Sequence, residues 1–242
     1  MTLSWAPVLQ GSYLGDSVLG FRAQAGTRHV AQLLSDLIGL QKRRQRPLWL
    51  VTFDLEKCFA TLPWWAVFGT LDHAGVPAPI VRAFRAFYAG LRQRFRLGQV
   101  DGQEWQAQNG LVQGCPASPD LLNILMEPFH RWAAGQGFGV PVQADSRVAS
   151  TSYADDLGLA ADEWAYLLAL VQGYLDWCAL IHLKVHLDKT RIWSLRHPGA
   201  RCLPSPSGTA PSLSFPAIPS VWSAWSSGLT TSPPPVSTSP LG

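Results

Sequence analysis

Residues 147–161 read RVASTSYADDLGLAA, and this stretch decides the fold of the 242-residue chain. The runs on either side of YADD are short and rich in small and β-branched residues. They predict two strands, Arg147 to Ser152 and Leu157 to Ala161. The YADD segment between them predicts the tight tip of a β-hairpin, so Asp155 and Asp156 stand side by side at a turn.

A further carboxylate ends an apolar run far upstream. Pro47 breaks the preceding helix, and Leu48 to Phe53 is short enough to be a buried strand that delivers Asp54. If this strand neighbours the hairpin, the carboxylates converge, and their repulsion is tolerable only with cations between them. Taken singly, an Asp-Asp pair at a turn is more often plain turn chemistry.

Helical and strand-like patterns alternate along the rest of the chain, which predicts an α+β fold, an antiparallel sheet with helices packed on one face. The apolar positions from Val30 to Leu40 indicate one helix. Further helices are expected over Pro63 to Ala74, Pro79 to Leu91, Leu121 to Ala134 and Asp162 to Leu180. The expected further strands are a half-buried strand from Arg94 to Val100, its hairpin partner near Trp105 after an Asp101-Gly102 turn, and a last strand from Leu187 to Leu195.

The composition permits a nucleic-acid partner without demanding one, since the net charge is only +3 and the pI about 8.8. A basic cluster follows the first helix, and it could contact phosphates, although a solvated surface is the plainer interpretation. Its members are Lys42, Arg43, Arg44 and Arg46.

The cysteines predict neither a disulfide framework nor a zinc site, because Cys58, Cys115, Cys178 and Cys202 lie far apart without a CxxC pair. A reducing, intracellular setting is expected, with nucleus and cytoplasm not distinguished. The sequence also lacks a signal-peptide pattern and a long apolar stretch, so we expect neither secretion nor a membrane partner.

Beyond Arg201 no charged side chain occurs, and Ser, Pro and Thr dominate. We predict that residues 198–242 form a disordered tail. Trp222 and Trp225 are unusual there. They fit a short docking motif or a translation that has left its ancestral reading frame, and the sequence does not separate the two.

The ordered motifs resemble those of the reverse transcriptase family, of the non-LTR retrotransposon and group II intron type. Phe53 to Phe59 (FDLEKCF) looks like motif A, Gly110 to Asn123 like motif B and YADD like motif C. Leu183 to Thr190 is similar to motif D, and Gly20-Phe21-Arg22 with Gly26-Thr27 resembles the segment before motif A. The resemblance covers roughly Val18 to Leu195 and implies a polymerase palm with partial fingers.

The resemblance also implies roles for single residues. Two Mg²⁺ ions, for which Mn²⁺ can substitute, would be held by Asp54, Asp155, Asp156 and the Leu55 carbonyl. Lys189 would protonate the departing pyrophosphate as a general acid. The nucleotide would meet the backbone of Leu55, Glu56, Lys57, Cys58 and Phe59, with the Phe59 ring as a steric gate favouring dNTP, and it would also meet Gln113 and Gly114. Phe59 has a plain alternative as a core residue.

The implied partners are an RNA or DNA template with its primer, and dNTP. Nucleic acid would contact Arg22, Pro116, Ser118 and Tyr153. The oligomeric state stays open.

The chain departs from the family pattern at both ends. Nothing before Gly20 resembles the fingers, and no thumb follows Leu195, so we expect a truncated palm over residues 20–197 after a poorly defined segment, 1–19. The alternatives are a catalytically inactive nucleic-acid-binding remnant and an RNA-directed RNA polymerase. The latter usually has Gly before its Asp pair, and Ala154 with the bulky Phe59 argues against it.

Overall fold

The computed structural model describes residues 13–23 and 25–195, so the predictions for the tail and for residues 1–12 lie outside the described residues. The helices are α2 (Thr27–Arg44), α3 (Cys58–Thr61), α4 (Trp64–His73), α5 (Ala78–Ala89), α6 (Ser118–Gly135) and α7 (Trp164–Leu180), with a 3-10 turn η1 (Leu187–Lys189). The strands are β1 (Leu48–Phe53), β2 (Arg92–Leu97), β3 (Val100–Gln106), β4 (Val140–Gln143), β5 (Ser146–Val148), β6 (Ser150–Tyr153), β7 (Asp156–Ala161) and β8 (Arg191–Leu195). None of the helices in these ranges is long and apolar enough to cross a bilayer.

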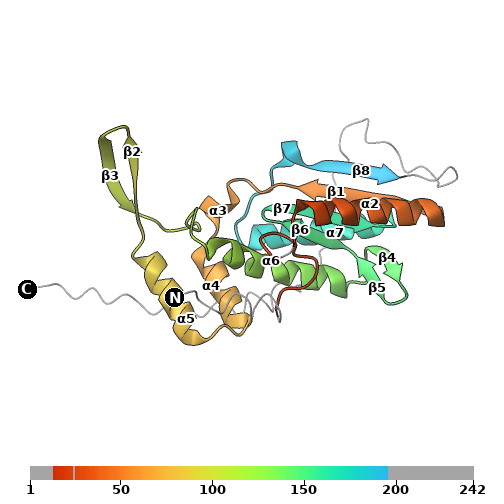
Figure 1. Cartoon of the computed structure of the whole chain (residues 1–242), viewed down its shortest axis with the longest axis horizontal. Helices are drawn as coiled ribbons and strands as arrows, with labels where there is room; N and C mark the ends of the chain where they lie inside the picture. Colours follow the sequence, from red (N-terminus) through yellow and green to blue (C-terminus); the bar gives the residue numbers. More distant parts are fainter. Residues whose placement is uncertain (1–12, 24, 196–242) are drawn as a thin grey trace, which may run out of the picture.

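A four-stranded antiparallel sheet forms the centre of the molecule, in the order β6-β7-β1-β8 (Figure 1). Strand β1 occupies the run Leu48–Phe53 that the sequence predicts, and it pairs with β7 in a register that sets Phe53 opposite Leu157. The expectation that the Asp54 strand and the YADD hairpin are neighbours is therefore confirmed.

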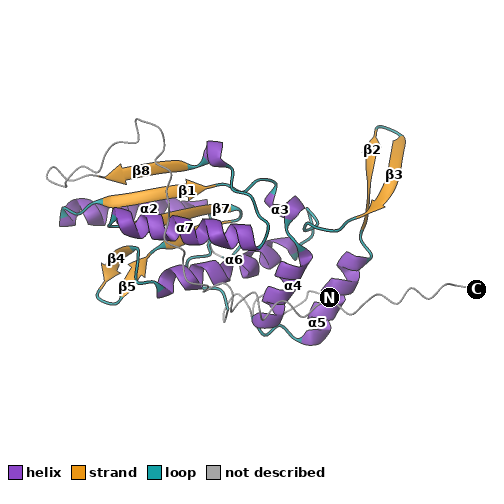
Figure 2. Ribbon diagram, turned by 180° about the vertical axis from the view of Figure 1, so that it is seen from behind, coloured by secondary structure: helices purple, strands orange, loops and turns teal. Residues whose placement is uncertain are grey.

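Helices α6 and α7 pack on one face of this sheet (Figure 2). The alternation of β1 sends Trp49 and Phe53 toward α7, where their rings meet Trp164 and Tyr174 at centroid distances of 4.9 and 5.1 Å. Burial of such aromatic side chains supplies most of the driving force for docking a helix on a sheet. The predicted α+β class, with helices on this face, is confirmed.

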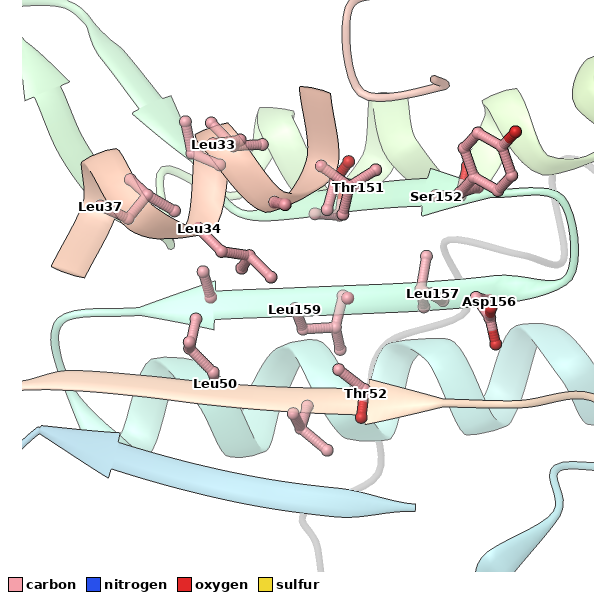
Figure 3. Close-up of a pocket in the computed structure, with 18 of the residues that line it drawn as sticks. Leu33, Leu34, Leu37, Leu50, Thr52, Thr151, Ser152, Asp156, Leu157 and Leu159 are labelled. Atoms are coloured by element: carbon pink, nitrogen blue, oxygen red, sulfur yellow. The ribbon is translucent and has the colours of Figure 1, made fainter. Parts of the chain in front are cut away.

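Helix α2 crosses part of the opposite face, where the sequence pattern expected no cover. An open, mainly apolar groove of about 720 Å³ lies between α2 and the strands. Figure 3 shows Leu34 of α2 pointing toward the sheet, in which β1 carries Leu50 and Thr52, with Asp156 at one end of the groove. Helices α6 and α7 thus cover one side over β6, β7 and β1, whereas α2 covers only part of the other side.

The predicted strand Arg147 to Ser152 is wrong in its continuity. It is divided into β5 and β6, because β5 pairs with β4 in a separate small hairpin while β6 pairs with β7. Strand β4 escaped prediction because its four residues, VPVQ, contain a proline and are too few for a periodic signal.

The prediction for the β2–β3 ribbon is correct in kind but wrong in two details. The turn is at Gly98 and Gln99, where Gly98 has φ +62°, and Asp101-Gly102 lies inside β3. The turn forms at Gly98 because glycine adopts the left-handed region without steric cost. The ribbon is also exposed throughout rather than half-buried, because no described element packs on it.

The last predicted strand begins later than expected. Residues 187–189 form the 3-10 turn η1, and only Arg191 to Leu195 pair with β1. The four helices predicted after Pro47 are all present, with ends within three residues of those expected.

Candidate active site at the carboxylate end of the sheet

Three carboxylates meet at one end of the central sheet. One step beyond the Phe53–Leu157 pair, the register brings Asp54 opposite Asp156, while Asp155 lies in the turn that joins Tyr153 to Asp156. Burial raises the pKa of Asp156 above its ordinary value, and the negative charges of Asp155 and Asp54 raise it further.

Lys189 supplies a positive charge to this cluster. The 3-10 turn η1 directs its Nζ to Asp54 Oδ2 at 2.6 Å, although the Lys189 side chain remains 61% exposed. The hydrogen bond to Asp54 raises the pKa of Lys189. The structure therefore brings together all four residues that the family resemblance indicates for catalysis.

The segment around Lys189 is tied to the segment after β1 by backbone hydrogen bonds. Leu55 and Val185 form an antiparallel bridge, the Glu56 amide donates to the Lys184 carbonyl at 2.8 Å, and the His186 amide donates to the Asp54 carbonyl at 2.8 Å. These bonds fix the approach of Lys189 to Asp54. They also engage the Glu56 amide, one of the donors expected to meet the triphosphate.

The chemistry of the donor set fits a hard divalent cation, since three carboxylates share one ammonium group and Asp156 resists ionisation. The positions of the side chains, however, do not match such a site. In residues 13–23 and 25–195, no three His, Cys, Asp or Glu side chains lie in an arrangement that could hold a metal ion. Asp54 is instead turned to Lys189.

The tip of the β6–β7 hairpin packs closely against the backbone of the segment that contains Leu19 and Gly20. Leu19 donates to the Ser152 carbonyl at 2.9 Å, and the chain then passes so near the tip that a Cβ on Gly20 would lie 2.3 Å from the Ala154 nitrogen. Ala154 itself has φ +57°, a left-handed conformation that costs an alanine about 1 kcal/mol or more. These backbone contacts at the tip therefore fix the position of Asp155.

Phe59 lies in α3, partly buried against the core, and it connects the segment after β1 to the loop before α6. The Leu111 amide donates to the Phe59 carbonyl at 2.6 Å, and the Gly110 amide donates to the Leu62 carbonyl at 2.8 Å. Gly110 has φ +90°, and a Cβ there would meet the Ala60 oxygen at 2.7 Å. The loop can approach α3 only because this residue is glycine.

The remaining nucleotide-side residues differ in exposure. In the Gly110–Pro119 loop, Gln113, Gly114 and Pro116 are exposed, whereas Ser118 is buried and its Oγ donates to the Val112 carbonyl at 2.7 Å. In the segment after β1, Lys57 is exposed at the start of α3 and Cys58 is buried.

Arg22 and Tyr153 both lie where the segment before α2 passes the β6–β7 hairpin. Arg22 Nη1 donates to the Gly15 carbonyl at 2.8 Å and to the Val18 carbonyl at 3.3 Å, so its guanidinium group holds the loop that passes the hairpin. The Tyr153 ring stacks on that of Phe21 at 6.3 Å. Both residues thus contribute to local structure in addition to any contact with nucleic acid.

The basic cluster after α2 combines surface and structural residues. All four side chains are exposed, and Arg44 also donates to the carbonyls of Pro141 and Val142, which fastens the β4–β5 hairpin. Arg46 approaches Asp162 at 3.9 Å.

The sequence interpretation missed a polar stripe on the buried face of α6. Asn123 Nδ2 donates to the Gly20 carbonyl at 2.7 Å, and Glu127 Oε2 accepts from the Gly15 amide at 3.0 Å. His130 lies between the hydroxyls of Ser150 and Ser152, at 2.8 and 2.9 Å. Polar residues at intervals of four and three in an apolar helix are the signal that could have revealed it.

The family model described as reverse transcriptase (RNA-dependent DNA polymerase) matches residues 5–222. The chain belongs to the reverse transcriptase family. Two curated members are similar in sequence. The Retrovirus-related Pol polyprotein from type-2 retrotransposable element R2DM of Drosophila melanogaster is 25% identical over 70% of this chain. The Transposon TX1 uncharacterized 149 kDa protein of Xenopus laevis is 26% identical over 54% of it.

This reverse transcriptase domain spans only a small part of those relatives, 16% of the fly protein and 10% of the frog protein. Solved structures agree on the fold. Apo telomerase from Candida tropicalis has a TM-score of 0.60 at 14% identity, covering 78% of this chain and 35% of its own. Telomerase from Candida albicans, in complex with a fragment of telomeric RNA, has a TM-score of 0.60 at 13% identity, covering 78% and 32%.

Proposed function

We propose that this chain is the palm of an RNA-directed DNA polymerase that adds dNTPs to a primer 3′-hydroxyl on an RNA or DNA template. The observation that carries the proposal is the antiparallel pairing of β1 with β7, which puts Asp54 beside Asp155 and Asp156. Membership of the family and the partial match to retrotransposon proteins support the reaction class.

Asp54, Asp155 and Asp156, with the Leu55 carbonyl, are the residues that would hold two Mg²⁺ ions. Such ions, when bound, lower the pKa of the attacking hydroxyl and neutralise the pyrophosphate leaving group. With such a cation bound, Asp54 would no longer need the Lys189 ammonium as its partner. The released Lys189, on an exposed and flexible side chain, is then free to donate a proton to pyrophosphate.

The loop and helix around Phe59 would select and orient the nucleotide. The Phe59 ring is partly buried against the core, and the Phe59 carbonyl accepts a hydrogen bond from the loop that carries Gln113 and Gly114. A fixed ring there would exclude a ribose 2′-hydroxyl. Phe59→Ala should therefore relax the preference for dNTP over rNTP, and an unchanged sugar preference would remove this assignment.

The deciding experiment measures Mg²⁺-dependent dNTP addition to a primed RNA template. It uses this chain and a longer one that restores flanking fingers and thumb segments, each as wild type and as Asp155→Asn. Incorporation should occur in the wild type and vanish in the variant, while circular dichroism shows both folded. If the longer wild-type chain is as inactive as its variant, the catalytic proposal fails.

A second candidate is a nucleic-acid-binding member of the family without catalysis. The ion pair that holds Asp54, together with the lack of a metal-holding arrangement in the described residues, favours it. Binding to template that persists in EDTA, with no incorporation by either chain, would support this candidate over the first.

A further inference from the structure

The β2–β3 ribbon projects from the body of the molecule as an arm, which both views show (Figures 1 and 2). Every residue of both strands is exposed. An isolated two-stranded ribbon is at best marginally stable in water, so an arm of this composition suits a binding role better than a structural one. None of the catalytic roles proposed above uses it.

One face of the arm is apolar and aromatic. Leu97 lies opposite Val100 and Gln93 opposite Trp105, so the period of two sets Phe95 on the same face as these residues. The Phe95 and Trp105 rings lie 4.8 Å apart. Exposure is 77% for Phe95, 85% for Leu97, 71% for Val100 and 39% for Trp105. Ring surface is therefore open to solvent.

The other face carries a row of arginines. Arg92, Arg94 and Arg96 alternate along β2, about 6.6 Å from one to the next at the usual strand rise. They contact two acidic residues. Asp101 forms an ion pair with Arg94 at 3.2 Å and accepts a hydrogen bond from Arg96 at 2.5 Å, and Glu104 lies 4.0 Å from Arg92.

Three cations against two anions leave this face with a net charge of +1. All of the pairs are solvent-exposed, and such pairs contribute little to stability. A phosphate can therefore replace a carboxylate at low cost. Charge complementarity favours an anionic polymer over an apolar protein surface, which would leave the arginine row unused.

The base of the arm is held to the end of α5 and continues into the proposed nucleotide-binding loop. The Ala107 amide donates to the Leu91 carbonyl at 3.1 Å, and Gln106 Nε2 donates to the Ala89 carbonyl at 2.6 Å. These contacts anchor the base of the ribbon, and the chain then enters the loop that carries Gln113 and Gly114. A strand leaving that loop unpaired would meet the arm.

We propose that the β2–β3 arm binds single-stranded nucleic acid, namely the unpaired template next to the active site. Its bases stack on Phe95 and Trp105, and its phosphates meet Arg92, Arg94 and Arg96. Because the ribbon has only two strands, a polynucleotide that runs along its edge borders both faces. The assignment of this strand as template rests on the proposed function, whereas the binding itself does not.

The test is the affinity of the full chain for a fluorescein-labelled 20-nucleotide oligouridine, measured by anisotropy in EDTA without dNTP. We expect Phe95→Ala with Trp105→Ala to raise Kd about tenfold or more, since base stacking on aromatic side chains is strong. Replacing Arg92, Arg94 and Arg96 by Gln should flatten the dependence of log Kd on log salt. The matched control is Trp65→Ala, which removes an exposed tryptophan of α4 and should leave Kd unchanged.

A second measurement needs no variant and so does not depend on variant folding. Ultraviolet crosslinking of 4-thiouridine RNA to the wild type should label the peptide from Arg92 to Gln106. Wild-type affinity in both arm variants, or crosslinks confined to other peptides, overturns the proposal. So does a dimer in sedimentation that the Phe95 and Trp105 changes dissociate, since the arm would then be a protein interface. A failure of dNTP incorporation alone leaves the arm proposal standing, because the binding assay contains neither metal nor nucleotide.

Discussion

Within the described residues, the β6–β7 and β2–β3 hairpins are similar in size and opposite in character. The β6–β7 hairpin is enclosed: its strands are largely buried, α6 lies behind it and the Gly20 segment passes against its tip. The β2–β3 arm is exposed along its whole length. The comparison teaches that the first hairpin fixes the position of a carboxylate, whereas the second presents side chains to a partner. Substitutions should therefore cost stability in the first and binding in the second.

The largest effect is expected where two backbones touch at the tip of β6–β7. Gly20→Ala sets a Cβ 2.3 Å from the Ala154 nitrogen, and neither backbone can yield easily. We expect the free energy of unfolding to fall by about 3 kcal/mol in urea titrations. Gly135→Ala is the control, since a Cβ there meets nothing within 4 Å. Equal stability of the two variants would mean that the tip is not tightly enclosed.

The next effect concerns pH. Burial lowers the pKa of His130 to about 3, so the folded state keeps it neutral while the unfolded chain binds a proton near pH 6.5. The stability contributed by neutral His130 is therefore present above pH 6.5 and is lost as pH falls toward 3. The cost is about 2 kcal/mol by pH 5.

The measurement for His130 is the difference in unfolding free energy between wild type and His130→Gln across pH 5 to 7.5. Taking the difference cancels the titration of Glu127 and Asp156, whose pKa values are raised. The difference should shrink as pH falls. His182→Gln, at an exposed position, should track the wild type throughout. A difference that is constant with pH would contradict neutral burial of His130.

A smaller effect of opposite sign is expected at Ala154. Glycine tolerates the φ of +57° that strains alanine, so Ala154→Gly should raise the unfolding free energy by up to about 1 kcal/mol. Ala161→Gly lies in the regular part of β7 and should lower it instead. Thermal melts of the two variants, moving in opposite directions, would locate the strain at the tip.

The smallest effect is expected on the arm. Leu97→Ala removes an apolar side chain that is already in solvent, so unfolding free energy should change by less than about 0.5 kcal/mol. Urea titration against Leu157→Ala, in the buried part of β7, provides the contrast, because a cavity there costs about 2–5 kcal/mol. A large loss for Leu97→Ala would mean that the arm is packed and would remove the distinction between the hairpins.

Sequence reasoning worked best where one periodic pattern dominates. The run Leu48–Phe53 has no competing interpretation as a helix, and the order of FDLEKCF, the Gly110 loop and YADD indicated which strands should be neighbours. It worked less well where tertiary contacts decide. In the ribbon the turn forms at Gly98, which adopts a positive φ without steric cost, rather than at Asp101-Gly102, and the division of β5 from β6 depends on a partner strand, β4.

The candidate site was predictable in its residues but not in its contacts. The resemblance indicated Asp54 and Lys189, but only tertiary structure shows them 2.6 Å apart. The roles of Asn123 and His130 as buried hydrogen-bonding groups depend on which segments lie against α6, and local sequence carries no such information.

The polar stripe of α6 has a consequence for the order of events during synthesis. The Gly15 amide donates to Glu127, which lies 112 residues later in the chain. The Leu19 amide donates to the carbonyl of Ser152, which is synthesised later still. Closing contacts of such long sequence separation is slow. The first described segment to leave the ribosome is therefore among the last to dock, and a nascent chain halted before β6 would expose it to chaperones and proteases.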